Sequence, residues 1–212
     1  PTYKAKVPEE LLTPDKMESS YLGELRFQDG FPTKGTASKV SNFVDISRAV
    51  ELFINGTPAA SMYGMLNGHV KIGLEPNRSV GITEELMNAR SLWLTPQTTT
   101  PYVHAEIDVK DGPVVLDIGT PVLGFVNDAF FRYVTDLGLV GADKGKGGKY
   151  LFVGPDYEGE IPEGYFVSRT STYRHWALMR IAAKPGETKE AIEAFKKTFK
   201  IYPLADANNP KP

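Results

Sequence analysis

The stretch Thr95–Leu116 reads TPQTTTPYVHAEIDVKDGPVVL and sets the architecture that we expect of the chain. From Tyr102 to Val109 polar and apolar residues alternate, which is the two-residue period of a β-strand with two different faces. Gly112 and Pro113 then mark a turn, and Val114 to Ile118 has the continuous apolar character of a buried strand. The stretch therefore predicts two strands joined by a tight turn, preceded by a polar, threonine-rich segment.

The polar side of this strand is the best candidate for a functional site. Tyr102, His104 and Glu106 point one way, and Val103, Ala105 and Ile107 point the other. A cavity lined by the polar side would offer phenol, imidazole and carboxylate groups. A second interpretation is equally compatible with the pattern, because the solvated outer face of an antiparallel strand alternates in the same way.

Two kinds of site residue follow from this stretch and its surroundings. The candidates for catalysis are His104, Glu106 and Tyr102, because an imidazole two residues from a carboxylate on one face could act as a base with its orienting group, or as a metal-binding pair. The candidates for ligand binding are Gln97, Thr99, Thr100, Tyr102, Asp128 and Arg180.

Arg180 enters that group because it lies inside an apolar strand. A guanidinium buried between Met179 and Ile181 needs a partner, and Asp128, Asp136 or Glu106 could supply it. Such a pair would either be structural or hold an anionic ligand.

The remaining patterns favour an α+β protein. Short strands at 150–153, 165–168 and 176–182, separated by glycine and proline turns, are typical of a β-sandwich or jelly-roll-like antiparallel sheet. Helical spacing runs from Phe43 to about Leu66, with a break expected at residues 55–58, and Thr83 is expected to cap a short helix that ends near Trp93. Residues 186–200 predict an amphipathic C-terminal helix.

This reading divides the chain into an N-terminal arm at 1–40, a helical part at 41–94 and a sandwich part with closing helix and polar tail at 95–212. All three are expected to form one structural domain.

Composition excludes several chemistries. The chain contains no cysteine, so disulfides, thiolate nucleophiles and iron–sulfur clusters are excluded. The net charge of -2 gives no global attraction to nucleic acid, and no apolar run approaches the roughly 20 residues of a membrane helix. The basic loop 143–149 lacks the order of a phosphate-binding P-loop and precedes a strand, so we interpret it as a hairpin loop and assign neither a cofactor nor a metal.

Several phrases together carry a resemblance to a known family. They are LRFQDGFPT, RAVELFINGTPAASMYGM, LTPQTTTPYVHAEIDVKDGPVV, DKGKGGKYLFVGPDYEGEIPEGYF and TYRHWALMR. They resemble the N-terminal domain of the bacterial domain-of-unknown-function 1254 family, which is usually followed by a domain-of-unknown-function 1214 half. The resemblance implies N-terminal helices beside a β-sandwich. It also implies a partner, namely the C-terminal half of the same protein as a companion chain or missing domain, and a periplasmic or secreted location.

One departure from the family concerns the candidate site. Relatives usually read Asn-x-Asp-Thr-x-Tyr where this chain reads QTTTPY at residues 97–102. The resemblance therefore implies that Thr99 replaces a family carboxylate, while Thr100 and Tyr102 are retained.

Two classes of function remain open at this point. The first is a soluble bacterial binding protein with a small-molecule pocket at residues 97–106. The second is a hydrolase-like enzyme that uses His104 and Glu106, with a metal-assisted variant that would recruit His175 or Asp108. A small-molecule ligand and a second copy of the chain are the further partners considered.

Overall fold

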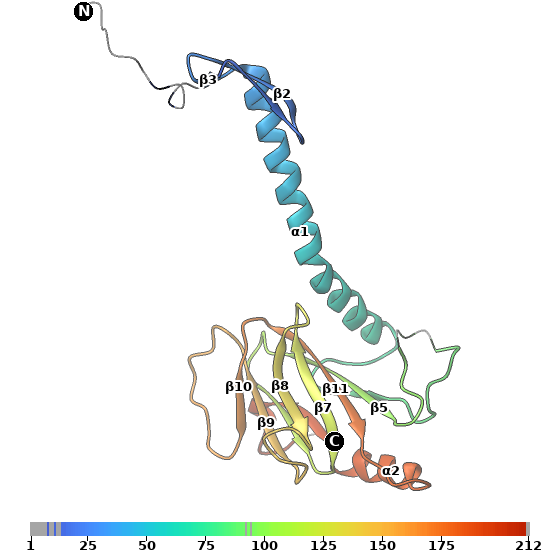
Figure 1. Ribbon diagram of the computed structural model, residues 1–212. Coiled ribbons are helices and arrows are strands. Elements are labelled where there is room, and N and C mark those ends of the chain that lie inside the picture. Colours follow the sequence, from blue (N-terminus) through green and yellow to red (C-terminus); the bar gives the residue numbers. More distant parts are fainter. Residues whose placement is uncertain (1–7, 9–10, 12–13, 92, 94, 211–212) are drawn as a thin grey trace, which may run out of the picture. The chain divides into compact units, whose positions relative to one another are not determined.

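The structure is a computed structural model that describes residues 8, 11, 14–91, 93 and 95–210. Figure 1 shows its elements. In chain order they are β1 (Lys16–Ser19), β2 (Gly23–Gln28), β3 (Phe31–Pro32), α1 (Lys34–Lys71), β4 (Val80–Ile82), β5 (Tyr102–Asp108), β6 (Val114–Ile118), β7 (Val122–Asp128), β8 (Tyr133–Gly138), β9 (Gly148–Val153), β10 (Phe166–Arg169), β11 (Arg174–Ile181), α2 (Thr188–Thr198), β12 (Lys200–Pro203) and the 3-10 helix η2 (Leu204–Asp206).

The chain divides into two compact units, Pro1–Thr57 and Pro58–Pro212, and the boundary falls inside α1. The break expected at residues 55–58 does not form, since α1 contains Pro58 as an internal residue. No helix in the described part of the chain is long and apolar enough to cross a membrane.

The first unit contains the small sheet β1-β2-β3 and the first part of α1. Asp29 and Gly30 join β2 to β3 with φ values of 50° and 82°, which is the two-residue turn that matches the twist of a hairpin. Thr36 of α1 fixes the helix to this sheet, because its buried hydroxyl donates to the Arg26 carbonyl and accepts from the Arg26 amide.

The second unit is built on two sheets with strand orders β4-β5-β11-β7-β8 and β10-β9-β6-β12. All pairings in the first sheet are antiparallel, whereas β9 and β10 in the second are parallel. The predicted α+β class with sandwich-like sheets is confirmed, and the parallel pair is the departure from an all-antiparallel arrangement.

The main core lies between the two sheets. One face of β5, β11 and β7 supplies small and branched side chains, which meet Leu116, Tyr150 and Phe152 of the other sheet. Helix α2 adds Ile192 and Phe195 to the same core, as its amphipathic pattern predicts. Because strand residues alternate, this packing turns the other face of β5 and β11 outward from the sandwich.

Two local predictions are wrong. The helix expected from Thr83 to Trp93 is absent among the described residues. Asn88 makes local turns there instead: its side-chain oxygen accepts from the Arg90 backbone amide, and its backbone amide donates to the Ser91 hydroxyl. Such side-chain bonds compete with helix formation. The loop 143–149 does not close a hairpin either, because it leads from β8 in one sheet to β9 in the other.

Candidate functional site

The outer face of β5 and β11 brings polar and aromatic side chains together. Strand register places Trp176 opposite Glu106, and Leu178 opposite His104. Tyr102, His104 and Glu106 are nevertheless only 4%, 6% and 5% exposed. The solvated-face interpretation of this strand is therefore wrong.

The cover over this face comes from two segments of the same unit. Met62 and Leu66, near the end of α1, are fully buried in a second apolar cluster with Tyr102 and Trp176. Trp93 packs against the same cluster from the long connection between β4 and β5. Apolar and aromatic groups thus enclose the polar face. We call this face together with its cover the outer-face cluster; it comprises Met62, Leu66, His69, Trp93, Tyr102, His104, Glu106, Arg174, Trp176 and Leu178.

His104 lies at the centre of the outer-face cluster. Its ring is stacked on Trp176 with centroids 5.9 Å apart, meets Trp93 edge-on at 4.9 Å and lies 5.8 Å from Tyr102. The Trp176 indole Nε1–H donates to His104 Nδ1 over 3.3 Å. Since a neutral imidazole carries one proton, this bond places the proton on Nε2.

Burial is the main reason why the pKa of His104 is lowered to about 4, and nearby His69 adds to the shift. The two imidazole centroids are 5.4 Å apart. Burial also lowers the pKa of His69. Both rings are therefore neutral at pH 7, and His104 presents an N–H donor rather than a charge.

Glu106 is held by a two-pronged ion pair with Arg174. The Arg174 Nε and Nη2 atoms lie 2.7 Å and 2.6 Å from Glu106 Oε1. Arg174 in turn approaches the amide oxygen of Asn67 at 3.4 Å and lies over the Tyr63 ring. Burial raises the pKa of Glu106, while the Arg174 hydrogen bond and charge act against that shift.

The second carboxylate oxygen of Glu106 has no hydrogen-bond partner although it is buried. A buried acceptor without a partner costs free energy, commonly about 1–3 kcal/mol. The outer-face cluster therefore combines an unused acceptor at Glu106 with the Nε2–H donor of His104, two residues away on the same face of β5.

The threonine-rich turn at residues 97–100 supplies fewer free polar groups to the candidate site than its composition suggested. The Gln97 side-chain oxygen accepts from the neighbouring Thr98 amide, and Thr99 is exposed. The Thr100 hydroxyl is buried without a partner. Tyr102 is fixed through its backbone, because its amide donates to the Thr83 hydroxyl over 2.7 Å.

Asp128 and Arg180 are not brought together. Asp128 closes the turn between β7 and β8 by accepting from the Phe130 and Arg132 amides and from the Arg132 side chain. These bonds, led by the Arg132 side chain, hold the pKa of Asp128 below its usual value despite its burial. Arg180 instead lies 5.6 Å over the Tyr102 ring and lines a cavity of about 230 Å³ with Asp136.

The metal-assisted variant finds no ligand set among the residues that the structure describes, where no three acidic or histidine side chains gather suitably. His175, one of its expected ligands, precedes Trp176 on β11 and so points into the opposite face of the sheet. There its Nδ1 lies 3.3 Å from the Ile107 carbonyl oxygen and it is fully buried.

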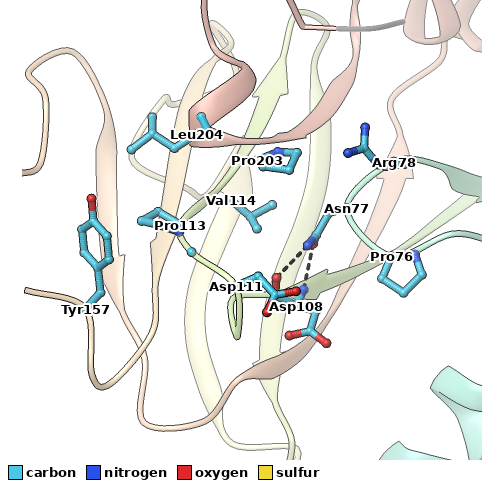
Figure 2. A pocket seen from close by; sticks show the side chains of 12 residues that line it. Pro76, Asn77, Arg78, Asp108, Asp111, Pro113, Val114, Tyr157, Pro203 and Leu204 are labelled. Atoms are coloured by element: carbon cyan, nitrogen blue, oxygen red, sulfur yellow. Dashed lines mark hydrogen bonds between the residues drawn. The ribbon is translucent and has the colours of Figure 1, made fainter. Parts of the chain in front are cut away.

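A cavity of about 680 Å³ shares no lining residue with the outer-face cluster, and Figure 2 shows the side chains that line it. It is lined by Pro76, Asn77, Arg78, Asp108, Asp111, Gly112, Pro113, Val114, Tyr157, Pro203, Leu204 and Ala205. The Asn77 side chain is engaged with the backbone of Asp108, and Arg78 lies 3.8 Å from Asp206. Its size alone does not make it the better candidate, because its polar groups are solvated or already paired.

Sequence reasoning named Arg180 on β11 but missed Arg174, Trp176 and Leu178. These residues alternate along β11 in the same way as the polar residues of β5, and this pattern is visible in the sequence. Met62, Leu66 and His69 share one face of α1 through their spacing of four and three residues. What the sequence did not provide was the docking of that helix face onto this strand.

The chain belongs to the family described as protein of unknown function (DUF1254), whose model matches residues 77–203, more than half of the chain. The matched range contains β5 and β11, and so the strands of the outer-face cluster. The family's function is not known. A search among curated proteins found no match.

Among solved structures, the crystal structure of the VPA0106 protein from Vibrio parahaemolyticus is similar, with a TM-score of 0.57 and 19% sequence identity. The match covers 76% of this chain and 39% of the Vibrio chain, so this chain spans well under half of that protein's length. At this level of identity the likeness shows a shared fold and nothing about activity.

Proposed function

We propose that this protein binds a small, neutral, partly apolar organic molecule at the outer-face cluster. The observation behind the proposal is the unpartnered, buried oxygen of Glu106, which lies two residues from His104 and its Nε2–H on the same face of β5. Ligand sites are typically apolar and aromatic with a few polar groups that fix orientation. The Trp93, Tyr102 and Trp176 rings supply the aromatic part.

Access to the cluster requires movement of its cover. The connection from Thr83 to Pro101 contains neither helix nor strand among its described residues, and it carries Trp93 onto His104. Long irregular connections are commonly binding loops or lids. In this proposal Trp93 occupies the site in the free protein and moves aside when the ligand enters.

The charges of the cluster define the ligand's class. Arg174 neutralises Glu106, and both nearby imidazoles are neutral at pH 7. A charged ligand would be buried without a counter-charge, which is costly. A hydroxyl that donates to Glu106 and a carbonyl or ether that accepts from His104 satisfy both groups, so we expect hydroxylated esters, amides or cyclic alcohols.

The hydrolase-like alternative is less well supported by the geometry. A general base needs a free lone pair, but His104 Nδ1 already accepts from Trp176 and Nε2 carries the proton. Glu106 is paired with Arg174 rather than with His104. Binding requires neither group to take up a proton.

A thermal-shift screen of neutral hydroxylated esters, amides and cyclic alcohols tests the proposal, followed by calorimetric titration of the best compound. Glu106→Gln replaces the free oxygen with an amide donor, and we expect about a tenfold loss of affinity, equal to about 1.4 kcal/mol. Glu193→Gln, on the exposed side of α2, is the matched control and should bind as the unaltered protein does. Equal affinity in all three proteins would exclude Glu106 from the site.

A further inference from the structure

The first part of α1 carries an exposed apolar stripe in the unit Pro1–Thr57. Its members are Val40, Phe43, Ile46, Val50, Phe53 and Ile54, and Phe53 is 76% exposed. At 3.6 residues per turn these six side chains fall within about 140° of the helix circumference. Asp45 and Arg48 lie on the other side of the helix, and Glu51 borders the stripe without entering it.

We propose that this stripe is the interface through which two copies of the chain associate as a symmetric dimer. The residues Phe43, Ile46, Val50 and Phe53 recur at intervals of three, four and three, which is the spacing of a helix that packs along another helix. A two-fold interface uses the same patch on both subunits, so it must be self-complementary. The stripe meets this requirement because no charged side chain interrupts it between Phe43 and Ile54.

The exposed area agrees with a dimer. The six side chains together expose on the order of 700 Å² per chain, which approaches the roughly 800 Å² that each partner buries in a standard interface. Tyr21 extends the patch, since its ring lies 6.4 Å from Phe43 and is 84% exposed. A contiguous apolar patch of this size is larger than most monomers leave in water.

Light scattering coupled to size exclusion tests the proposal with the whole chain. We expect a mass of twice 23.3 kDa at micromolar concentrations. Val50→Glu places a charge in the stripe and should shift the mass to that of one chain. Leu52→Glu is the matched control, because Leu52 is 74% exposed but lies on the opposite side of the helix, and this variant should remain a dimer.

Circular dichroism should show that both variants keep their helix content, since both positions are exposed. If Val50→Glu loses helix, Val50→Asn, which carries no charge, replaces it in the same comparison. An unaltered protein that elutes with the mass of one chain across the concentration range would overturn the proposal and would assign the stripe to a different partner. Equal dissociation of the two glutamate variants would also overturn it.

Discussion

At the scale of single residues, His104 is a buried imidazole whose pKa is strongly lowered. Burial, with His69 nearby, lowers its pKa from 6.5 to about 4. In the unfolded chain the same imidazole is protonated below pH 6.5, so between pH 6.5 and pH 4 the unfolded state binds the extra proton. The contribution of His104 to stability is therefore complete above pH 6.5 and is lost as the pH falls.

We expect the free energy of unfolding to decrease as the pH is lowered from 6.5 to 4, with His104 contributing up to about 1.4 kcal/mol per pH unit. Denaturant unfolding at several pH values measures this slope. His104→Gln should have a distinctly shallower slope over the same range, while His69 and His175 still contribute to it. Identical slopes would show that His104 titrates normally in the folded protein.

Arg174 pairs with the buried carboxylate of Glu106. Arg174→Met removes this partner, and we expect the substitution to destabilise the protein by about 3 kcal/mol at pH 7. Arg78→Met removes an exposed arginine 3.8 Å from Asp206 and should cost less than about 1 kcal/mol. Chemical unfolding of both variants gives the comparison, and similar losses would contradict the burial of the Glu106–Arg174 pair.

At the scale of elements, the strand and turn at 102–118 and the helix α2 could be predicted because their periodicity is strong and local. Strands β7 and β12 were missed, since β7 contains a glycine and ends in the polar pair Asn127-Asp128, and β12 has only four residues. The helix expected after Thr83 failed because Asn88 satisfies backbone amides locally. Alternation also identified the polar face of β5 but could not say that α1 covers it.

A substitution of Gly138 tests how closely the end of β8 packs against the backbone of Val122. Its φ is 73°, and a Cβ placed there would overlap the Val122 carbonyl oxygen at 1.9 Å. Gly164 also has a positive φ, of 90°, but has open space around it. We expect Gly164→Ala to cost about 1–2 kcal/mol from backbone strain alone and Gly138→Ala to cost roughly 2 kcal/mol more. Equal melting temperatures would mean that the backbone near Val122 adapts without cost.

At the scale of the whole molecule, we propose two separate sites, and a substitution in one should leave the other unchanged. The outer-face cluster lies within the unit 58–212, and the apolar stripe of α1 lies within the unit 1–57. Ligand binding should therefore persist in Val50→Glu, and the dimer should persist in Glu106→Gln. The family match supports neither proposal, because it names no activity.

The chain contains two tryptophans, Trp93 and Trp176, and both belong to the outer-face cluster with ring centroids 6.1 Å apart. Their fluorescence is thus a direct reporter of the proposed site. The most direct test is a titration of the best ligand from the screen, followed by tryptophan emission and by calorimetry in parallel. We predict a saturable change of emission with the same dissociation constant as the heat. A ligand that binds by calorimetry and leaves the emission unchanged would place the site elsewhere and contradict the account.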